Sequence, residues 1–198
     1  QLQLGFYDSA LADAADAAKP PAVVSLTTAD PAGDECAPSG ADAAEILDLA
    51  DDLEAAGEFV EAAEALRAVL QAQGPSARVM FMLAELLYRT GDLTAARERY
   101  YSVIELDPNH LQARASLGCV LAELGDHELA IAALDGVLRQ EPAYADAHWH
   151  IAGVLRETGN TADAAHHLRT FLTLAPESPW ADLARARLDE SAAGAGQP

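Results

Sequence analysis

The residues best suited to chemistry are four histidines near the C-terminal end, whose imidazole nitrogens could bind a transition metal. His148 and His150 are two positions apart in the sequence. On a helix this spacing separates them by about 200° around the axis, so they cannot share one ion. His166 and His167 are adjacent and would diverge by about 100°. We therefore expect no metal site and no cofactor.

The cysteines show no catalytic or redox pattern. Cys36 and Cys119 are far apart and form no CxxC or Cys/His motif, so neither a disulfide framework nor a redox pair is indicated. No neighbouring side chain is evident that would activate Cys119 as a thiolate. Nucleophile–base motifs and phosphate-binding glycine loops are also missing from the sequence. We expect the protein not to be an enzyme.

The charge balance restricts the class of partner. The 198 residues contain 32 Asp and Glu against 12 Lys and Arg, a net charge of −20. Residues 1–75 carry −13 (fifteen acids, two bases) and residues 76–198 carry −7 (seventeen acids, ten bases). Such a chain repels nucleic acid and anionic membrane surfaces, because both are bound through clustered positive charge. The acidity fits either solubility alone or attraction of a basic partner.

The sequence leaves the compartment open. No apolar run is long enough to cross a bilayer, so we expect a soluble chain without direct membrane insertion. Gln1 in place of methionine fits a trimmed chain as well as an exported chain after removal of a signal peptide. A cytoplasmic and a periplasmic location are therefore both open.

A 34-residue repeat determines which elements carry these side chains. Each unit has a leucine or isoleucine next to a small residue, a second leucine, a glycine and an alanine, and a proline closes the later units. The glycines are Gly57, Gly91, Gly125 and Gly159, the alanines are Ala62, Ala96, Ala130 and Ala164, and the prolines are Pro108, Pro142 and Pro176, with Gly74-Pro75 at the matching place in the first unit.

Each repeated residue type has a role in a pair of helices. Two leucines spaced i, i+4 line one face of a first helix, and the small residue lets a second helix approach closely. The glycine ends the first helix, since a left-handed residue closes its last turn at low steric cost. Asp92, Asp126 and Asn160 then cap the second helix. We expect first helices at about 43–56, 77–90, 111–124 and 145–158 and second helices at about 59–73, 93–106, 127–140 and 161–174.

The pattern of small residue, Leu, Gly, Ala and Pro resembles that of the tetratricopeptide repeat (TPR) family. The resemblance implies an all-α fold, a right-handed α-solenoid of four helix-turn-helix repeats with a C-terminal capping helix. The repeats fall at 43–76, 77–110, 111–144 and 145–178, so the array spans about residues 41–176 and the capping helix and flexible tail span 177–198.

The two ends of the chain differ from the repeats. Ser178-Pro179-Trp180 reads as the cap and first turn of the last helix, which we expect to reach about Glu190. Residues 1–40 form an acidic extension rich in Ala, Pro and Asp, with a short helix expected from Asp8 or Ser9 to Ala18.

In TPR arrays the first helices line a concave groove, mostly at repeat positions 2, 5, 9, 12 and 13. The resemblance implies that Phe81, Tyr88 and Trp149 anchor a partner there, as aromatic residues commonly do at interfaces. Arginines on this face would orient acidic or carbonyl groups of the partner, or else neutralise acidic neighbours within the chain. The candidate groove residues are Arg78, Phe81, Glu85, Tyr88, Arg89, Gln112, Cys119, Trp149 and Arg156.

The main functional hypothesis is a protein–protein interaction module, such as an adaptor, an assembly factor or a scaffold subunit of a larger complex. Its partner would be another protein or a peptide segment held in the groove. One alternative is a homo-oligomeric scaffold built by stacking of TPR faces. Another is a small-ligand sensor or an accessory subunit of an enzyme, which the fold alone does not exclude.

Overall fold

The computed structural model describes residues 40–194, and every regular element in this range is an α-helix. The all-α repeat fold predicted from the sequence is confirmed. The short helix expected before residue 19 lies outside the described residues. The helix pairs are α1 (Gly40–Ala56) with α2 (Phe59–Gln73), α3 (Ala77–Arg89) with α4 (Leu93–Leu106), α5 (Leu111–Glu123) with α6 (His127–Gln140), and α7 (Ala145–Glu157) with α8 (Thr161–Leu174), followed by α9 (Ala181–Gly194).

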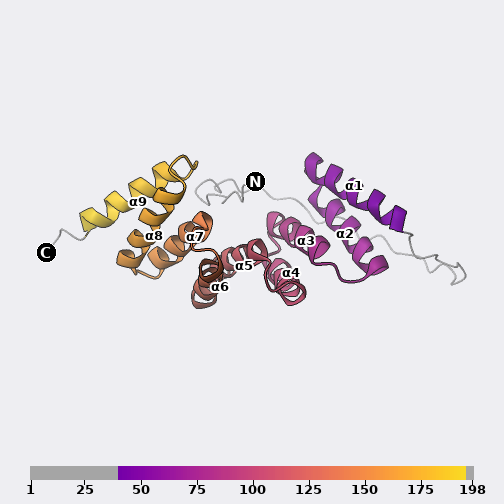
Figure 1. Ribbon diagram of the computed structural model, residues 1–198. Helices are drawn as coiled ribbons and strands as arrows, with labels where there is room; N and C mark the ends of the chain where they lie inside the picture. The colour runs from indigo at the N-terminus through magenta and orange to yellow at the C-terminus, as the bar shows by residue number, and fades with distance from the viewer. Residues whose placement is uncertain (1–39, 195–198) are drawn as a thin grey trace, which may run out of the picture. The chain divides into compact units, whose positions relative to one another are not determined.

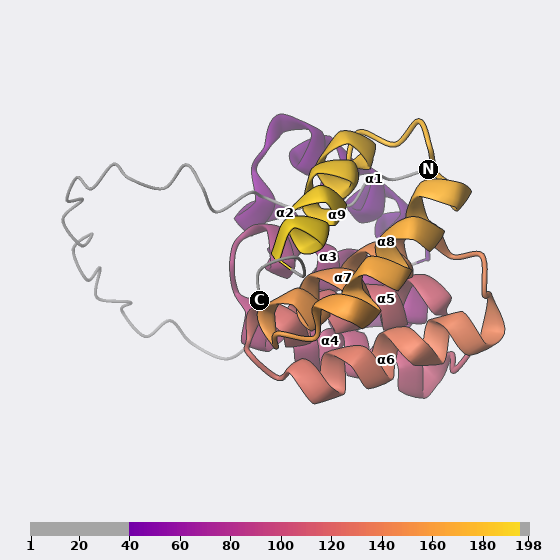
Figure 2. The same ribbon diagram turned by 90° about the vertical axis from the view of Figure 1, so that its left-hand side faces the viewer.

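Consecutive helices pack against one another along the chain, and α5 also packs directly against α7. Figure 1 shows α3, α5 and α7 in one row, with α4 and α6 in a second row beside it. The same two rows are seen after the rotation in Figure 2. The first helices of neighbouring repeats are therefore adjacent. None of the described helices has the length and apolar character needed to span a membrane.

A left-handed glycine closes the first helix of each repeat. Gly91 has a φ of +80°, and Gly125 has a φ of +83°. After Gly91, the amide of Asp92 donates a hydrogen bond of 2.9 Å to the carbonyl of Leu87. This bond satisfies a carbonyl that the helix end would otherwise leave unpaired. The periodic glycines therefore set where each first helix ends.

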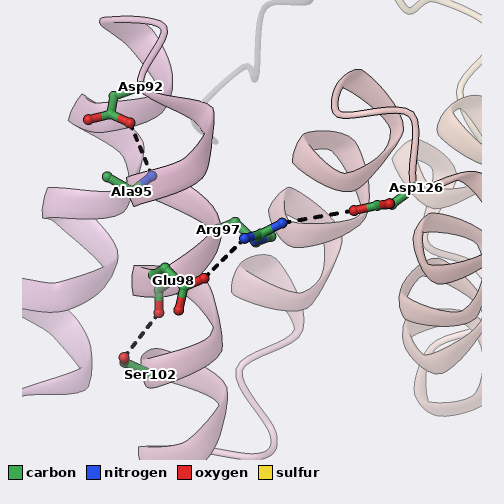
Figure 3. Close-up of polar contacts among 6 residues, drawn as sticks. All are labelled: Asp92, Ala95, Arg97, Glu98, Ser102 and Asp126. Atoms are coloured by element: carbon green, nitrogen blue, oxygen red, sulfur yellow. Dashed lines mark hydrogen bonds and ion pairs between the residues drawn. The ribbon is translucent and has the colours of Figure 1, made fainter.

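The residue just before each second helix makes different side-chain contacts in different repeats. The Asp92 carboxylate accepts a hydrogen bond of 3.1 Å from the amide of Ala95, as expected of a cap, and α8 is capped in the same way. The Asp126 side chain makes no such bond. Its carboxylate faces Arg97 of α4 instead, at 3.9 Å, and Arg97 also lies 3.2 Å from Glu98 (Figure 3). The prediction that Asp126 caps α6 through its side chain is wrong, because that side chain turns toward the preceding repeat.

Small residues allow the close approach of the two helices in a repeat. The four periodic alanines of the second helices are fully buried. In α5, a methyl group added at Gly118 would lie 2.6 Å from Cγ of Leu134 in α6. In the third repeat a small residue thus faces a leucine side chain where the two helices meet.

The last helix begins two residues later than predicted from the sequence, which places its cap at Ser178 and its first turn at Pro179. Ser178 accepts a hydrogen bond of 3.3 Å from the amide of Trp180 through its hydroxyl, and its carbonyl accepts one of 2.9 Å from the amide of Ala181. Residues 178–180 thus form a turn, and the helix starts at Ala181. Ala181 and Ala184 are buried, and α9 packs against α8.

Candidate binding face on the first helices

We use the term A-helix face for the side of the first helices that carries repeat positions 2, 5, 9, 12 and 13. On α3 and α5 its residues are Arg78, Phe81, Glu85, Tyr88, Arg89, Gln112, Ala115, Cys119, Ala122 and Glu123. On α1 and α7 they are Ala44, Leu47, Asp51, Glu54, Ala55, Asp146, Trp149, Gly153, Arg156 and Glu157.

Polar contacts join this face from one repeat to the next. Arg89 of α3 lies 2.5 Å from the carboxylate of Glu54 in α1, and Arg156 of α7 lies 3.2 Å from that of Glu190 in α9. The hydroxyl of Tyr88 donates to the carboxylate of Glu123 in α5. The partners are 34 or 35 residues apart, so each contact spans about one repeat period.

Two of the three arginines on the face are already engaged within the chain. Arg89 also places its guanidinium 4.3 Å from the centroid of the Phe59 ring, in addition to its ion pair with Glu54. Arg156 is paired with Glu190. Arg78 is exposed at the start of α3 and takes part in none of the ion pairs found within the described residues. Arg78 is therefore the arginine of this face that none of these ion pairs engages.

Glu85 connects three helices rather than pointing freely outward. Its carboxylate accepts hydrogen bonds from the hydroxyls of Tyr100 in α4, at 2.6 Å, and Ser116 in α5, at 3.0 Å. Burial raises the pKa of Glu85, while these two hydrogen bonds act in the opposite direction. Gln112, which is half-buried, lies near the start of α5. Glu85 thus fixes the spacing of the helices that carry its neighbours on the face.

The three predicted aromatic anchors differ in exposure. Tyr88 and Phe81 are half-buried, and the Phe81 ring lies 4.7 Å from that of His110. Trp149 is only 6% exposed, since its ring packs against Phe171 at 5.3 Å and stacks on Trp180 at 5.9 Å. Trp149 therefore holds the last helices together, and little of its ring is left for a partner.

Cys119 is buried in the middle of the face. Its pKa is raised by burial and then by the carboxylates of Glu123, Glu85 and Asp146. Such a thiol forms a thiolate poorly and is a weak nucleophile. The same three carboxylates come from α5, α3 and α7, so they create a negative potential at the centre of the A-helix face.

Two histidines meet across helices in a way the sequence analysis did not anticipate. The Nδ1 atoms of His148 in α7 and His167 in α8 are 2.9 Å apart, and Nε2 of His148 lies 3.1 Å from the carbonyl oxygen of Pro142. Because a carbonyl only accepts, Nε2 of His148 carries a proton, and its Nδ1 accepts from His167 when both rings are neutral. Helical periodicity relates only residues on the same helix, so it does not reveal this pair. Within the described part of the chain, no three metal-ligating side chains form a cluster.

An open depression lies at the first-repeat end of the A-helix face. It has a volume of about 420 Å³ and is lined by Asp51, Glu54, Ala55 and Arg89. All four lining residues stand at the repeat positions 9, 12 and 13 that the sequence predicts for this face.

Comparison with known proteins identifies the family. The tetratricopeptide repeat family matches the sequence at residues 47–110 and 116–179, which is more than half of the chain. The chain therefore belongs to the tetratricopeptide repeat family.

Individual relatives match different shares of the chain. The probable biofilm formation methyltransferase WspC of Pseudomonas aeruginosa is 40% identical over 83 residues, which cover 42% of this chain and 19% of WspC. The chain thus spans about a fifth of that relative. Among solved structures, YrrB, a TPR protein with an unusual peptide-binding site, has a TM-score of 0.67 at 22% identity, covering 73% of this chain and 74% of YrrB. MamA from Desulfovibrio magneticus RS-1 has a TM-score of 0.67 at 20% identity, covering 77% of this chain and 89% of that one.

Proposed function

We propose that this protein is a non-catalytic interaction module that binds a segment of another protein along the A-helix face. The observation that carries the proposal is the position of Tyr88, a half-buried aromatic residue between α3 and α5. The first helices α3, α5 and α7 stand side by side (Figure 1). An extended segment lying across them would contact several repeats at once.

Tyr88 has the properties of an interface anchor. Its ring offers apolar surface, and its hydroxyl is held by Glu123, so little side-chain freedom is lost when a partner binds. Phe81 adds half-buried aromatic surface near the other end of α3. The exposed Arg78 can donate to carbonyl or carboxylate groups of the bound segment. We assign Trp149, Arg89 and Arg156 to the support of this face.

The relatives support a binding role at the level of the family. YrrB is described as having a peptide-binding site, and its structure shares the fold of this chain. WspC is named a methyltransferase, but the matched residues cover only a fifth of it. Its activity is therefore not a basis for an enzymatic proposal here.

The proposal can be tested with peptides that bind the purified chain, selected from a random library by display. We expect Tyr88→Ala to weaken binding of the selected peptides by roughly 30-fold, which corresponds to about 2 kcal/mol for an aromatic anchor. Tyr101 is a matched control, since it is a 40% exposed tyrosine on α4, and Tyr101→Ala should leave the affinity unchanged. Circular dichroism checks that both variants remain helical.

The opposite result would place binding elsewhere. If Tyr101→Ala weakens the peptides while Tyr88→Ala does not, the A-helix face is not the binding surface. The mass of the purified chain in solution tests the homo-oligomeric alternative, which predicts assemblies larger than one chain in the absence of any partner.

A further inference from the structure

Two arginine side chains meet at one point in the third repeat. Arg114 stands near the start of α5, and Arg139 stands in the last turn of α6. Nη1 of Arg114 and Nη2 of Arg139 each lie 3.5 Å from the point that a Cβ atom of Gly136 would occupy. Two atoms at that distance from one point are no further apart than twice the distance. The two guanidinium groups are therefore neighbours, and their like charges repel each other.

No ion pair within the described residues neutralises either of these arginines. Asp135 stands four residues before Arg139 on α6, a spacing that commonly forms an ion pair on a helix. The pair is not formed, and the Arg139 guanidinium lies toward Arg114 instead. The chain has 32 acidic residues and only 12 Lys and Arg. Two adjacent cations without a carboxylate are therefore unexpected in this chain.

Gly136 leaves room for the Arg114 side chain. It is buried inside α6, where glycine is less favourable for a helix than alanine. A Cβ atom at this position would lie 3.1 Å from Cδ of Arg114, which is shorter than the favourable carbon–carbon separation of about 3.5–4.0 Å. The glycine thus allows Arg114 to lie against α6, next to Arg139.

Arg114 also has a hydrogen-bond donor that the described chain leaves unused. Its Nη2 atom donates a hydrogen bond of 2.9 Å to the carbonyl of Pro108, whereas its Nε atom is buried without an acceptor among the described residues. The bond to Pro108 accounts for Arg114 taken singly. A cation also stabilises a helix C-terminus, which accounts for Arg139 taken singly. Neither contact explains why the two charges are adjacent without an anion.

We propose that Arg114 and Arg139 bind an oxyanion, a phosphate or carboxylate group, over Gly136. Each guanidinium group can donate to a different oxygen atom of one such group, and the negative charge offsets the repulsion between the two arginines. The net charge of −20 repels anions at long range, so we expect a Kd on the order of 1 mM. Neither arginine belongs to the A-helix face, so this inference is independent of the proposed function.

The test is a titration of the purified, ¹⁵N-labelled chain with sodium phosphate or sodium acetate, followed by NMR. Sodium chloride keeps the ionic strength constant. The buried Nε–H of Arg114 is protected from exchange with water and gives an observable signal. We expect this signal to shift and to saturate with at least one of the two oxyanions. The anion that saturates the shift identifies the group that the site prefers.

Three substitutions locate the site. Arg139→Gln should weaken the oxyanion about tenfold, because one of its two charge-assisted contacts is lost. Gly136→Ala keeps both charges but displaces the Arg114 side chain, whose Cδ would lie 3.1 Å from the new atom, and should also weaken binding. The matched control is Arg169→Gln, which removes an exposed arginine of α8 and should change the affinity less than twofold. Circular dichroism checks that all three variants remain helical.

Three results would overturn the inference. The first is an Arg114 signal that neither oxyanion shifts. The second is an equal loss of affinity in Arg139→Gln and Arg169→Gln, because binding would then follow the net charge alone. The third is binding that Gly136→Ala leaves unchanged, since the anion would then not lie where the two arginines meet. None of these results bears on the A-helix face, which the peptide experiment with Tyr88→Ala tests separately.

Discussion

At the scale of single residues, the space between the two helices of a repeat is set by Gly118. A methyl group at this position would lie 2.6 Å from Cγ of the fully buried Leu134. We expect Gly118→Ala to lower the free energy of unfolding by about 1–3 kcal/mol, because overpacking exceeds the gain of about 1 kcal/mol in helix propensity. Urea denaturation measures the change.

Gly153 provides the matched control for this prediction. It also lies within a first helix, and an added methyl group would have no atom within 4 Å. Gly153→Ala should therefore stabilise the protein by up to about 1 kcal/mol. Equal effects of the two substitutions would show that the contact between Gly118 and Leu134 is not tight in solution.

His150 should make stability depend on pH. It is 7% exposed, and burial lowers its pKa to about 4, below the ordinary value of 6.5. His150 therefore binds a proton more tightly in the unfolded chain than in the folded one. The contribution of neutral His150 to the stability of the fold is complete above about pH 6.5 and is lost as the pH falls toward 4. The expected loss is roughly 3 kcal/mol.

The pH dependence is measured as the free energy of unfolding in urea between pH 4.5 and 7.5. The fall toward low pH should be smaller in His150→Gln than in the unmodified protein. The control variant His166→Gln changes an exposed histidine and should retain the full fall. Identical slopes in all three proteins would contradict a neutral, buried His150.

At the scale of elements, α9 covers the last repeat and can be followed by fluorescence. Trp149 and Trp180, which stack at 5.9 Å, are the only two tryptophans in the sequence. Ala184 of α9 is fully buried. Ala184→Asp would bury an unpaired charge at a cost of several kcal/mol, so we expect α9 to detach and the tryptophan emission to shift to longer wavelength.

A control at Ala186 separates the detachment of α9 from a general effect of an added negative charge. Ala186 is exposed on the same helix, and Ala186→Asp should leave the emission unchanged. A red shift in both variants would mean that α9 is held by its charge balance rather than by the packing of Ala184.

At the scale of the whole molecule, the net charge of −20 should oppose the compact state. Raising NaCl from about 0.01 M to 0.15 M shortens the screening length from about 30 Å to 8 Å. We expect the melting temperature to rise, because weaker mutual repulsion of the acids outweighs the screening of a few exposed ion pairs. A stabilisation of about 1 kcal/mol would shift the midpoint by about 2–4 °C. A lower melting temperature in 0.15 M NaCl would show that ion pairs such as Arg89–Glu54 dominate.

The sequence alone determined the repeats, because their signals are local. The glycine at each first-helix end and the residues that follow it act over a few positions, and the expected second helices have the observed bounds. Local signals were weaker at Ser178-Pro179-Trp180, where the chain makes a turn before α9 begins. The 34-residue register of the repeats also predicted which residues lie on the A-helix face. The role of this face in binding stays a prediction.

Only the tertiary structure decided which side chains of that face are available. Arg89 pairs with a carboxylate of the preceding repeat, Arg156 pairs with one of α9, and Trp149 stacks on Trp180 in the turn before α9. His148 meets His167 on the adjacent helix. These contacts join residues 19 to 35 positions apart, and they depend on how helices pack. The residue pattern within one helix defines only the faces of that helix. The exposure of each side chain also depends on the residues that pack against it from other helices, and these are known only from the tertiary structure.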